Sequence, residues 1–150
     1  MPKKFLSSKS LKMEDIMKRL GIAILIFALS APSILWAESS GVEAEEMVFC
    51  RGIKELEPIG VSSQFFGKIN KIYCFTRITG APDTTTVYHV WYHGDREMAR
   101  VMLPIKSASW RTWSSKKMIG SWDGAWRVDV TAPDSSVIAT KEFIYKPGAE

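Results

Sequence analysis

Short runs of apolar and β-branched residues, separated by turn-forming residues, fill the chain from residue 47 onward. Alternation is clearest over residues 125–131, where Trp126, Val128 and Val130 share one face and are assigned to the core. No stretch of similar length has the 3.6-residue period of a helix. The pattern predicts strands over residues 47–53, 71–79, 85–93, 96–105, 109–114, 125–131 and 137–145.

About seven short strands of this kind are typical of an antiparallel β-sandwich. We therefore expect residues 47–146 to form an all-β, immunoglobulin-like sandwich, with residues 147–150 as a tail. Trp91 follows Cys74 by one predicted strand, as the core Trp follows the first cysteine of an immunoglobulin domain, so Trp91 is also assigned to the core. The second cysteine lies upstream instead of downstream, which argues against a true immunoglobulin domain.

The N-terminal part has a different pattern. Lys18 and Arg19 precede an apolar run from Leu20, and a small residue, Ala37, ends that region. A basic segment, an apolar segment and a small residue before a polar stretch are typical of a secretory signal peptide, here residues 1–37. The alternative is an uncleaved membrane anchor over residues 20–36.

The acidic residues 38–46 that follow are aperiodic and predict a flexible lead-in to the sandwich. Export would make the protein periplasmic or secreted, whereas an uncleaved N-terminal segment would anchor it in the inner membrane.

Charge supports this division of the chain. The formal net charge is +4, but residues 1–37 hold six basic and two acidic side chains, so the remainder carries fourteen of each. A balanced domain lacks the electrostatic footprint of a nucleic-acid-binding protein, and no nucleic-acid partner is expected.

The two cysteines, Cys50 and Cys74, both belong to the predicted domain. In an oxidising compartment a single pair predicts one disulfide, which would contribute about 3 to 4 kcal/mol by closing a loop of about 25 residues. The alternative is a pair of buried thiols.

Candidate chemistry is sparse. His89 and His93 are the chain's histidines, and on one strand they lie about 13 Å apart, too far to share a metal ion. The sequence holds no Gly-x-Ser-x-Gly elbow and no phosphate-binding glycine loop. We therefore expect no metal, no cofactor and no enzymatic activity, and an unrecognised hydrolase is a weaker alternative.

Several spaced motifs resemble the bacterial domain of unknown function family 2914. They are HVWYH at 89–93, WRTWSSK at 110–116, GAWRV at 124–128 and the closing EFIY. The resemblance extends over roughly residues 47–146 and implies an accessory domain of bacterial proteins with no catalytic residues to carry over.

Aromatic residues are the one feature above background. Exposed tryptophans beside arginines can anchor a protein partner or stack on sugar rings. The sequence therefore predicts a binding or protein-interaction domain of the bacterial cell envelope, with an envelope protein or glycan as partner and a carbohydrate-binding module as the alternative. The candidate surface residues are Trp113, Trp122, Arg111, Lys116 and Arg127. Trp110 and Trp113 are three residues apart, so at most one of them is expected to face solvent.

Overall fold

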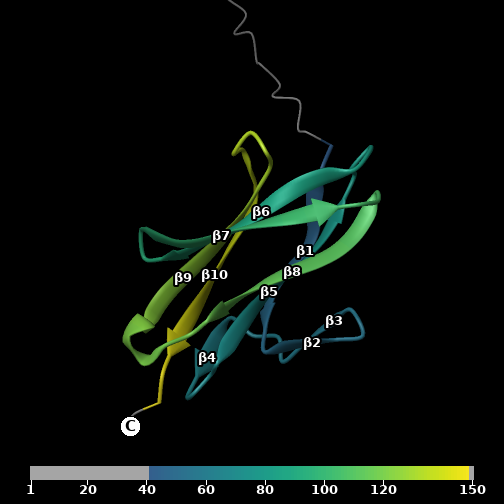
Figure 1. Cartoon of the computed structure of the whole chain (residues 1–150). Helices are drawn as coiled ribbons and strands as arrows, with labels where there is room; N and C mark the ends of the chain where they lie inside the picture. Colours follow the sequence, from purple (N-terminus) through teal and green to yellow (C-terminus); the bar gives the residue numbers. More distant parts are fainter. Residues whose placement is uncertain (1–40, 149–150) are drawn as a thin grey trace, which may run out of the picture. The chain divides into compact units, whose positions relative to one another are not determined.

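A computed structural model describes residues 41–148 of the chain (Figure 1). The predicted signal peptide or anchor, together with residues 38–40 of the lead-in, lies outside the described residues. Between residues 41 and 148 no helix is long and apolar enough to cross a membrane.

Most of the described residues lie in strands. These are β1 (Glu43–Cys50), β2 (Gly52–Lys54), β3 (Glu57–Ile59), β4 (Gln64–Phe66), β5 (Lys71–Thr79), β6 (Thr85–His93), β7 (Arg96–Ile105), β8 (Ser109–Lys117), β9 (Gly124–Thr131) and β10 (Val137–Lys146), with a single 3-10 turn, η2 (Gly120–Trp122), between β8 and β9.

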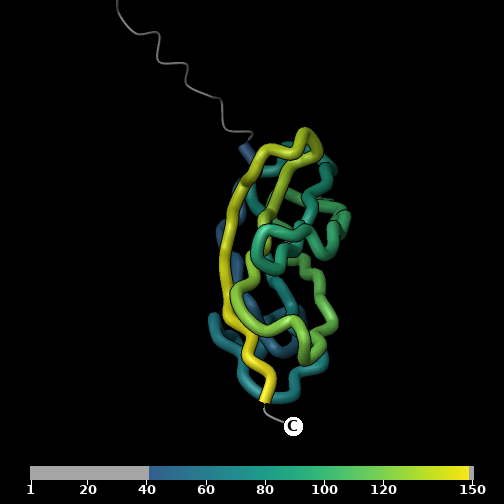
Figure 2. Tube along the Cα trace, turned by 90° about the vertical axis from the view of Figure 1, so that its left-hand side faces the viewer, coloured from purple at the N-terminus to yellow at the C-terminus, as the bar shows by residue number. Residues whose placement is uncertain are grey.

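Two sheets pack face to face, which confirms the predicted all-β sandwich. One has three strands in the order β1-β5-β8, and the other has five in the order β4-β10-β9-β6-β7. A separate two-stranded hairpin, β2–β3, follows β1. Figures 1 and 2 show residue 41 at one end of this unit and the C-terminal end of β10 at the other.

The sheet pairing departs from the prediction in two ways. The structure has three short strands, β2, β3 and β4, that the pattern did not predict as separate elements. β4 also pairs with β10 in parallel, so the sandwich is not antiparallel throughout. Strands of three residues are too short to show an alternating pattern, which is why the sequence did not reveal them.

The core fills the space between the two main sheets. Its two apolar clusters combine side chains of both sheets, such as Phe49 of β1 with Phe143 of β10, whose ring centroids lie 4.5 Å apart. All four side chains assigned to the core from sequence are buried, namely Trp91, Trp126, Val128 and Val130.

The predicted disulfide between Cys50 and Cys74 is wrong, because both are free, buried cysteines. Phe49 lies opposite Cys74 in the β1–β5 pair, and Cys50 lies opposite Tyr73. Since neighbouring residues of a strand point to opposite faces, the two sulfurs lie on opposite sides of the sheet. The alternative of two buried thiols therefore holds, and burial raises the pKa of both.

Strand β1 begins at Glu43, inside the segment predicted as a flexible lead-in, and it pairs with β5 from Glu43 to Cys50 with an irregularity between Ala44 and Glu46. Glu43 and Glu45 are exposed, and Glu46 makes an ion pair with Arg77 of β5. The carboxylates therefore remain at the surface while their backbone extends the sheet.

Candidate functional site

The predicted surface residues lie at three separate places instead of forming one patch. Trp113 and Arg111 are on the outer face of the three-stranded sheet. Trp122 and Lys116 lie together near the turn between β8 and β9, and Arg127 lies on the outer face of the five-stranded sheet.

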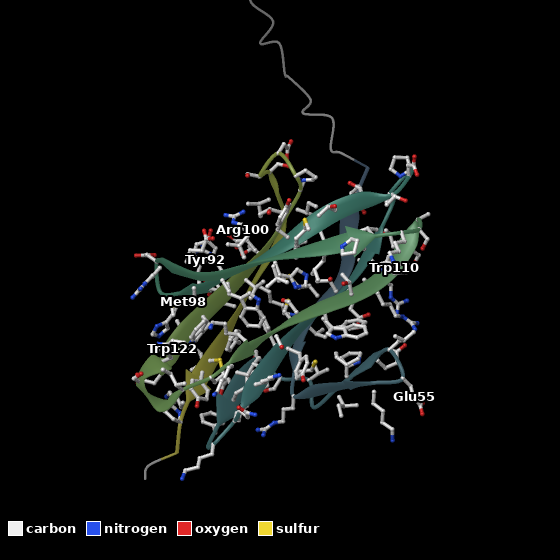
Figure 3. All side chains as sticks on the ribbon, in the orientation of Figure 1. Glu55, Tyr92, Met98, Arg100, Trp110 and Trp122 are labelled. Carbon is white, nitrogen blue, oxygen red and sulfur yellow. The ribbon has the colours of Figure 1, made fainter. Side chains whose placement is uncertain are left out.

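The first of these places is a hollow of about 450 Å³, here called the hairpin hollow. It lies between the tip of the β2–β3 hairpin and strands β5 and β8 of the three-stranded sheet. Its lining residues are Leu56, Arg77, Ser109, Trp110, Arg111 and Trp113. Figure 3 shows Trp110 and the hairpin residue Glu55 on one side of the unit and Trp122 on the other.

Strand register explains why these side chains meet. Phe75 of β5 lies opposite Trp113 of β8, and Arg77 lies opposite Arg111 two residues further along. Cross-strand partners share a face of the sheet, so an aromatic pair and an arginine pair occupy successive rows. Trp113 is stacked beside the fully buried ring of Phe75, with the planes 13° apart and the centroids 6.5 Å apart.

Trp110 corrects the expectation that at most one of the two β8 indoles reaches solvent. It packs against the second apolar cluster, on the inner face of the sheet, yet it also lines the hairpin hollow. Trp110 is the second residue of β8. At this end of the sheet its large ring contacts the second apolar cluster and also lines the hairpin hollow. Both indoles are half-buried.

The charges of the hairpin hollow are internally balanced. Arg111 makes a 3.1 Å ion pair with Glu57 of the hairpin, and Arg77 makes a 3.5 Å ion pair with Glu46 of β1. The Nε atom of Arg77 is buried without a hydrogen-bond acceptor. Arg77 therefore retains an unused donor, and the hollow as a whole favours neither cations nor anions strongly.

The hairpin tip has a strained backbone. Glu55 and Leu56 have φ angles of 51° and 62°, so both central residues have positive φ, as a type I′ turn requires. Asn and Gly normally fill these positions, and a bulky side chain there costs about 1 to 2 kcal/mol. Leu56 is nevertheless 55% exposed at the edge of the hollow. Sequence reasoning missed Leu56 because no Asn-Gly signal marks the turn, and it missed Arg77 because only the fold brings β5 beneath the hairpin.

The other predicted surface residues are engaged within the domain. The ammonium of Lys116 lies 4.6 Å from the Trp122 ring centroid, and the carbonyl of Trp122 accepts a 2.9 Å hydrogen bond from the indole of Trp126. Arg127 lies over the Tyr92 ring and donates a 3.0 Å hydrogen bond to Asp129.

His89 belongs to a buried network that joins the two sheets. Trp91 Nε1 donates to Ser114 Oγ at 3.0 Å, and His89 Nδ1 lies 2.8 Å from the same oxygen. His89 Nε2 lies 3.2 Å from Thr76 Oγ1, whose hydroxyl donates to the Thr112 carbonyl at 3.2 Å.

These contacts allow one arrangement of protons. Because Thr76 spends its proton on a carbonyl, its oxygen accepts from His89 Nε2, and His89 Nδ1 then accepts from Ser114. The imidazole is neutral, and burial lowers its pKa to about 3. Both His89 and Ser114 are buried, so this pair links the two sheets inside the domain.

The second histidine lies at the edge of the core. His93 stacks on the Trp126 ring at 4.8 Å, and its Nε2 donates to the carbonyl of Asp123 at 2.8 Å. Among residues 41–148 no three His, Cys, Asp or Glu side chains are grouped as a metal site would need.

Comparison with known proteins places part of this unit in a family. No curated protein matches the chain. One protein-family model, described as "Protein of unknown function (DUF2914)", matches residues 84–144. That stretch begins just before β6 and includes Trp110, Arg111 and Trp113 of the hairpin hollow, whereas Leu56 and Arg77 precede it. The resemblance seen in the sequence is thus confirmed over residues 84–144, which match the DUF2914 family model.

Proposed function

We propose that the chain is a noncatalytic protein-interaction domain, exported to the bacterial cell envelope, that binds its partner in the hairpin hollow. The observation that carries the proposal is the exposed Leu56, held with positive φ beside two half-buried indoles. Export rests on the basic and apolar pattern of residues 1–37.

The strain at the hairpin tip supports a binding role. A glycine or asparagine would remove most of the cost of positive φ, so the bulky leucine lowers the stability of the free domain. Backbone strain of this kind concentrates at sites where the side chain is needed for recognition. Burial of the Leu56 side chain against a partner would offset the free energy that its positive φ costs in the free domain.

The composition of the hollow also suits binding. Tryptophan and arginine are the residues that most often dominate the energy of protein interfaces, and Trp113 and Arg111 lie side by side here. Arg77 lies beside them, where its ion pair with Glu46 holds the guanidinium in the lining of the hollow. Neither arginine nor tryptophan acts as a nucleophile or a general base at neutral pH, which fits a noncatalytic site.

A protein partner is favoured over a glycan because the hairpin carries further exposed apolar side chains. Ile59 is 49% exposed and Val61 is 56% exposed, on the same segment as Leu56. Aliphatic side chains bind apolar surface, whereas sugars need flat rings and many polar contacts. The two indoles keep a carbohydrate-binding module as the second candidate.

Capture of a partner from envelope extracts by the tagged full chain tests the proposal. Trp113→Ala and Leu56→Asp are expected to weaken capture about 30-fold or more, as loss of a central interface side chain does. Leu56 is exposed, so its replacement tests binding without opening a cavity in the core.

Trp122→Ala and Met102→Ala are the matched controls. Met102 is 66% exposed on β7, and Trp122 lies away from the hairpin hollow. Both controls should capture the partner as the wild type does. Equal capture by all five proteins would contradict the proposal, and a Trp113-dependent fluorescence shift with envelope glycans, without protein capture, would favour the carbohydrate module.

A further inference from the structure

A second surface lies at the opposite end of the unit from residue 41. Here the turn between β4 and β5, the end of β8, and the C-terminal end of β10 come together (Figures 1 and 2). Two adjoining hollows of about 590 and 450 Å³ share Lys68, Ile69 and Asn70 in their linings. We call this surface the basic end, and its cations are Arg51, Lys68, Lys71, Lys116, Lys117 and Lys146.

The cations of the basic end have no carboxylate partners. The four ion pairs among residues 41–148 use only Arg77, Arg100, Arg111 and Arg127. Neither hollow has Asp or Glu in its lining. Lys71 and Lys117 even lie directly opposite each other across β5 and β8, an arrangement that like charges disfavour in a free domain.

Charge is therefore separated along a domain whose overall balance is neutral. Four acidic residues lie at the other end, where Glu43 and Glu45 begin β1 and Asp83 and Asp134 lie in the β5–β6 and β9–β10 turns, while Asp123 after η2 is, among residues 41–148, the acidic residue nearest the larger hollow in sequence. Such separation turns the basic end toward an anionic surface, and it does so without any net charge on the domain.

Exposed apolar side chains accompany the cations. Phe66, the last residue of β4, is 56% exposed and lies opposite Lys146 of β10. Ile119, two residues after Lys117, is 41% exposed. An anionic polysaccharide or nucleic acid offers charge but no hydrocarbon, whereas a lipid bilayer offers both phosphate headgroups and acyl chains.

From this combination we infer that the basic end docks on the surface of an anionic lipid bilayer. The lysines contact the headgroup phosphates, and Phe66 and Ile119 enter the boundary between headgroups and acyl chains. The hairpin hollow takes no part in this contact, so docking on a bilayer does not depend on the proposed partner site.

Fluorescence of a labelled full chain tests the docking. A thiol introduced by Ser121→Cys, an exposed position in the lining of the larger hollow, carries an environment-sensitive dye, and Ala108→Cys carries it in the β7–β8 turn as a reference. The native thiols are buried with raised pKa, so they react slowly by comparison.

Vesicles of phosphatidylglycerol mixed with phosphatidylcholine are expected to shift the emission of the dye at position 121 to shorter wavelength. Vesicles of phosphatidylcholine alone, and the dye at position 108, should show no such shift, and added salt should reverse it. Because every sample contains the same N-terminal residues, their own affinity for lipid cancels between the two dye positions and between the lysine variant and its control.

Variants identify the groups responsible. Lys71→Gln combined with Lys117→Gln should lower the ratio of docked to undocked molecules about 30-fold, which is about fivefold for each lysine. The control Arg100→Gln combined with Lys106→Gln removes the same charge elsewhere and should leave the shift in place. Phe66→Ser should also weaken docking, because it removes an exposed apolar side chain of the basic end.

Three results would overturn the inference. They are equal shifts with neutral and anionic vesicles, equal shifts in the lysine variant and its control, or binding of soluble inorganic polyphosphate in preference to vesicles. The last would assign the basic end to a soluble polyanion instead of a bilayer.

Discussion

The buried His89 makes the stability of the domain depend on pH in a way that can be calculated. Its pKa is lowered by burial to about 3, whereas an imidazole in the unfolded chain has a pKa of about 6.5. Below pH 6.5 the unfolded state therefore binds a proton that the folded state excludes. The full stability is present above pH 6.5 and is lost progressively as the pH falls from there toward 3.

The magnitude follows from about 1.4 kcal/mol for each pH unit within that window. Relative to pH 8, the imidazole alone costs the fold about 2 kcal/mol at pH 5 and about 3 kcal/mol at pH 4. Carboxylates also titrate at these pH values, so the useful quantity is the difference between the wild type and a variant without this imidazole.

His89→Gln is that variant, because the amide keeps one donor and one acceptor but does not titrate here. Urea unfolding followed by tryptophan fluorescence gives the free energy of unfolding of each protein at pH 8 and pH 5. The wild type should lose about 2 kcal/mol more than His89→Gln between these two values. His93→Gln, which removes the other imidazole, is the matched variant that shows whether the effect is specific to position 89.

Equal losses in the wild type and His89→Gln would refute the reasoning. A proton titration of His89 near pH 6.5 in the folded protein, measured by NMR, would refute it as directly, because the ring would then be charged without loss of the fold.

Three further predictions concern the fold. Ser114→Ala leaves the indole of Trp91 and Nδ1 of His89 without their partner, and should lower the free energy of unfolding by about 2 to 4 kcal/mol in urea titrations. Gly80→Ala should lower the thermal midpoint markedly, since φ is +76° and a Cβ would lie 1.7 Å from the carbonyl oxygen of Gly41; an unchanged midpoint would disprove the close approach. Mass mapping without reductant should find Cys50 and Cys74 unlinked and slow to alkylate until the protein unfolds, and a bridged peptide would contradict the observed register.

The longer strands could be predicted from sequence because alternation and turn residues fix their ends. The bounds of β5, β6 and β7 agree with the predicted runs at 71–79, 85–93 and 96–105. Gly94, with φ of 56°, starts the two-residue turn between β6 and β7.

Register could not be predicted from the pattern alone. The disulfide prediction failed because pairing β1 with β5 places Cys50 opposite Tyr73, and a shift of one residue decides which face a side chain takes. A bulge in the β6–β7 pair similarly turns Met98 toward the core, although strict alternation assigns it to the face of Arg100.

The candidate site was predicted only in part, for the same reason. Trp113 and Arg111 stand out by residue type, and the structure places both in the hairpin hollow. Leu56 and Arg77 join them only because the hairpin folds back over β5 and β8, a long-range contact with no local signature. Trp122 instead contacts Trp126, because the turn before β9 packs against the core.

The central claim is that a protein partner occupies the hairpin hollow in the cell envelope. Photo-crosslinking in cells tests it most directly, with a photoreactive residue replacing Ser109 of the hollow lining and, separately, Met102 of β7 as the reference position. The account predicts one discrete crosslinked protein from position 109, lost when Leu56→Asp is added, and none from position 102. Crosslinks of equal yield at both positions, or a position-109 product that survives Leu56→Asp, would contradict it.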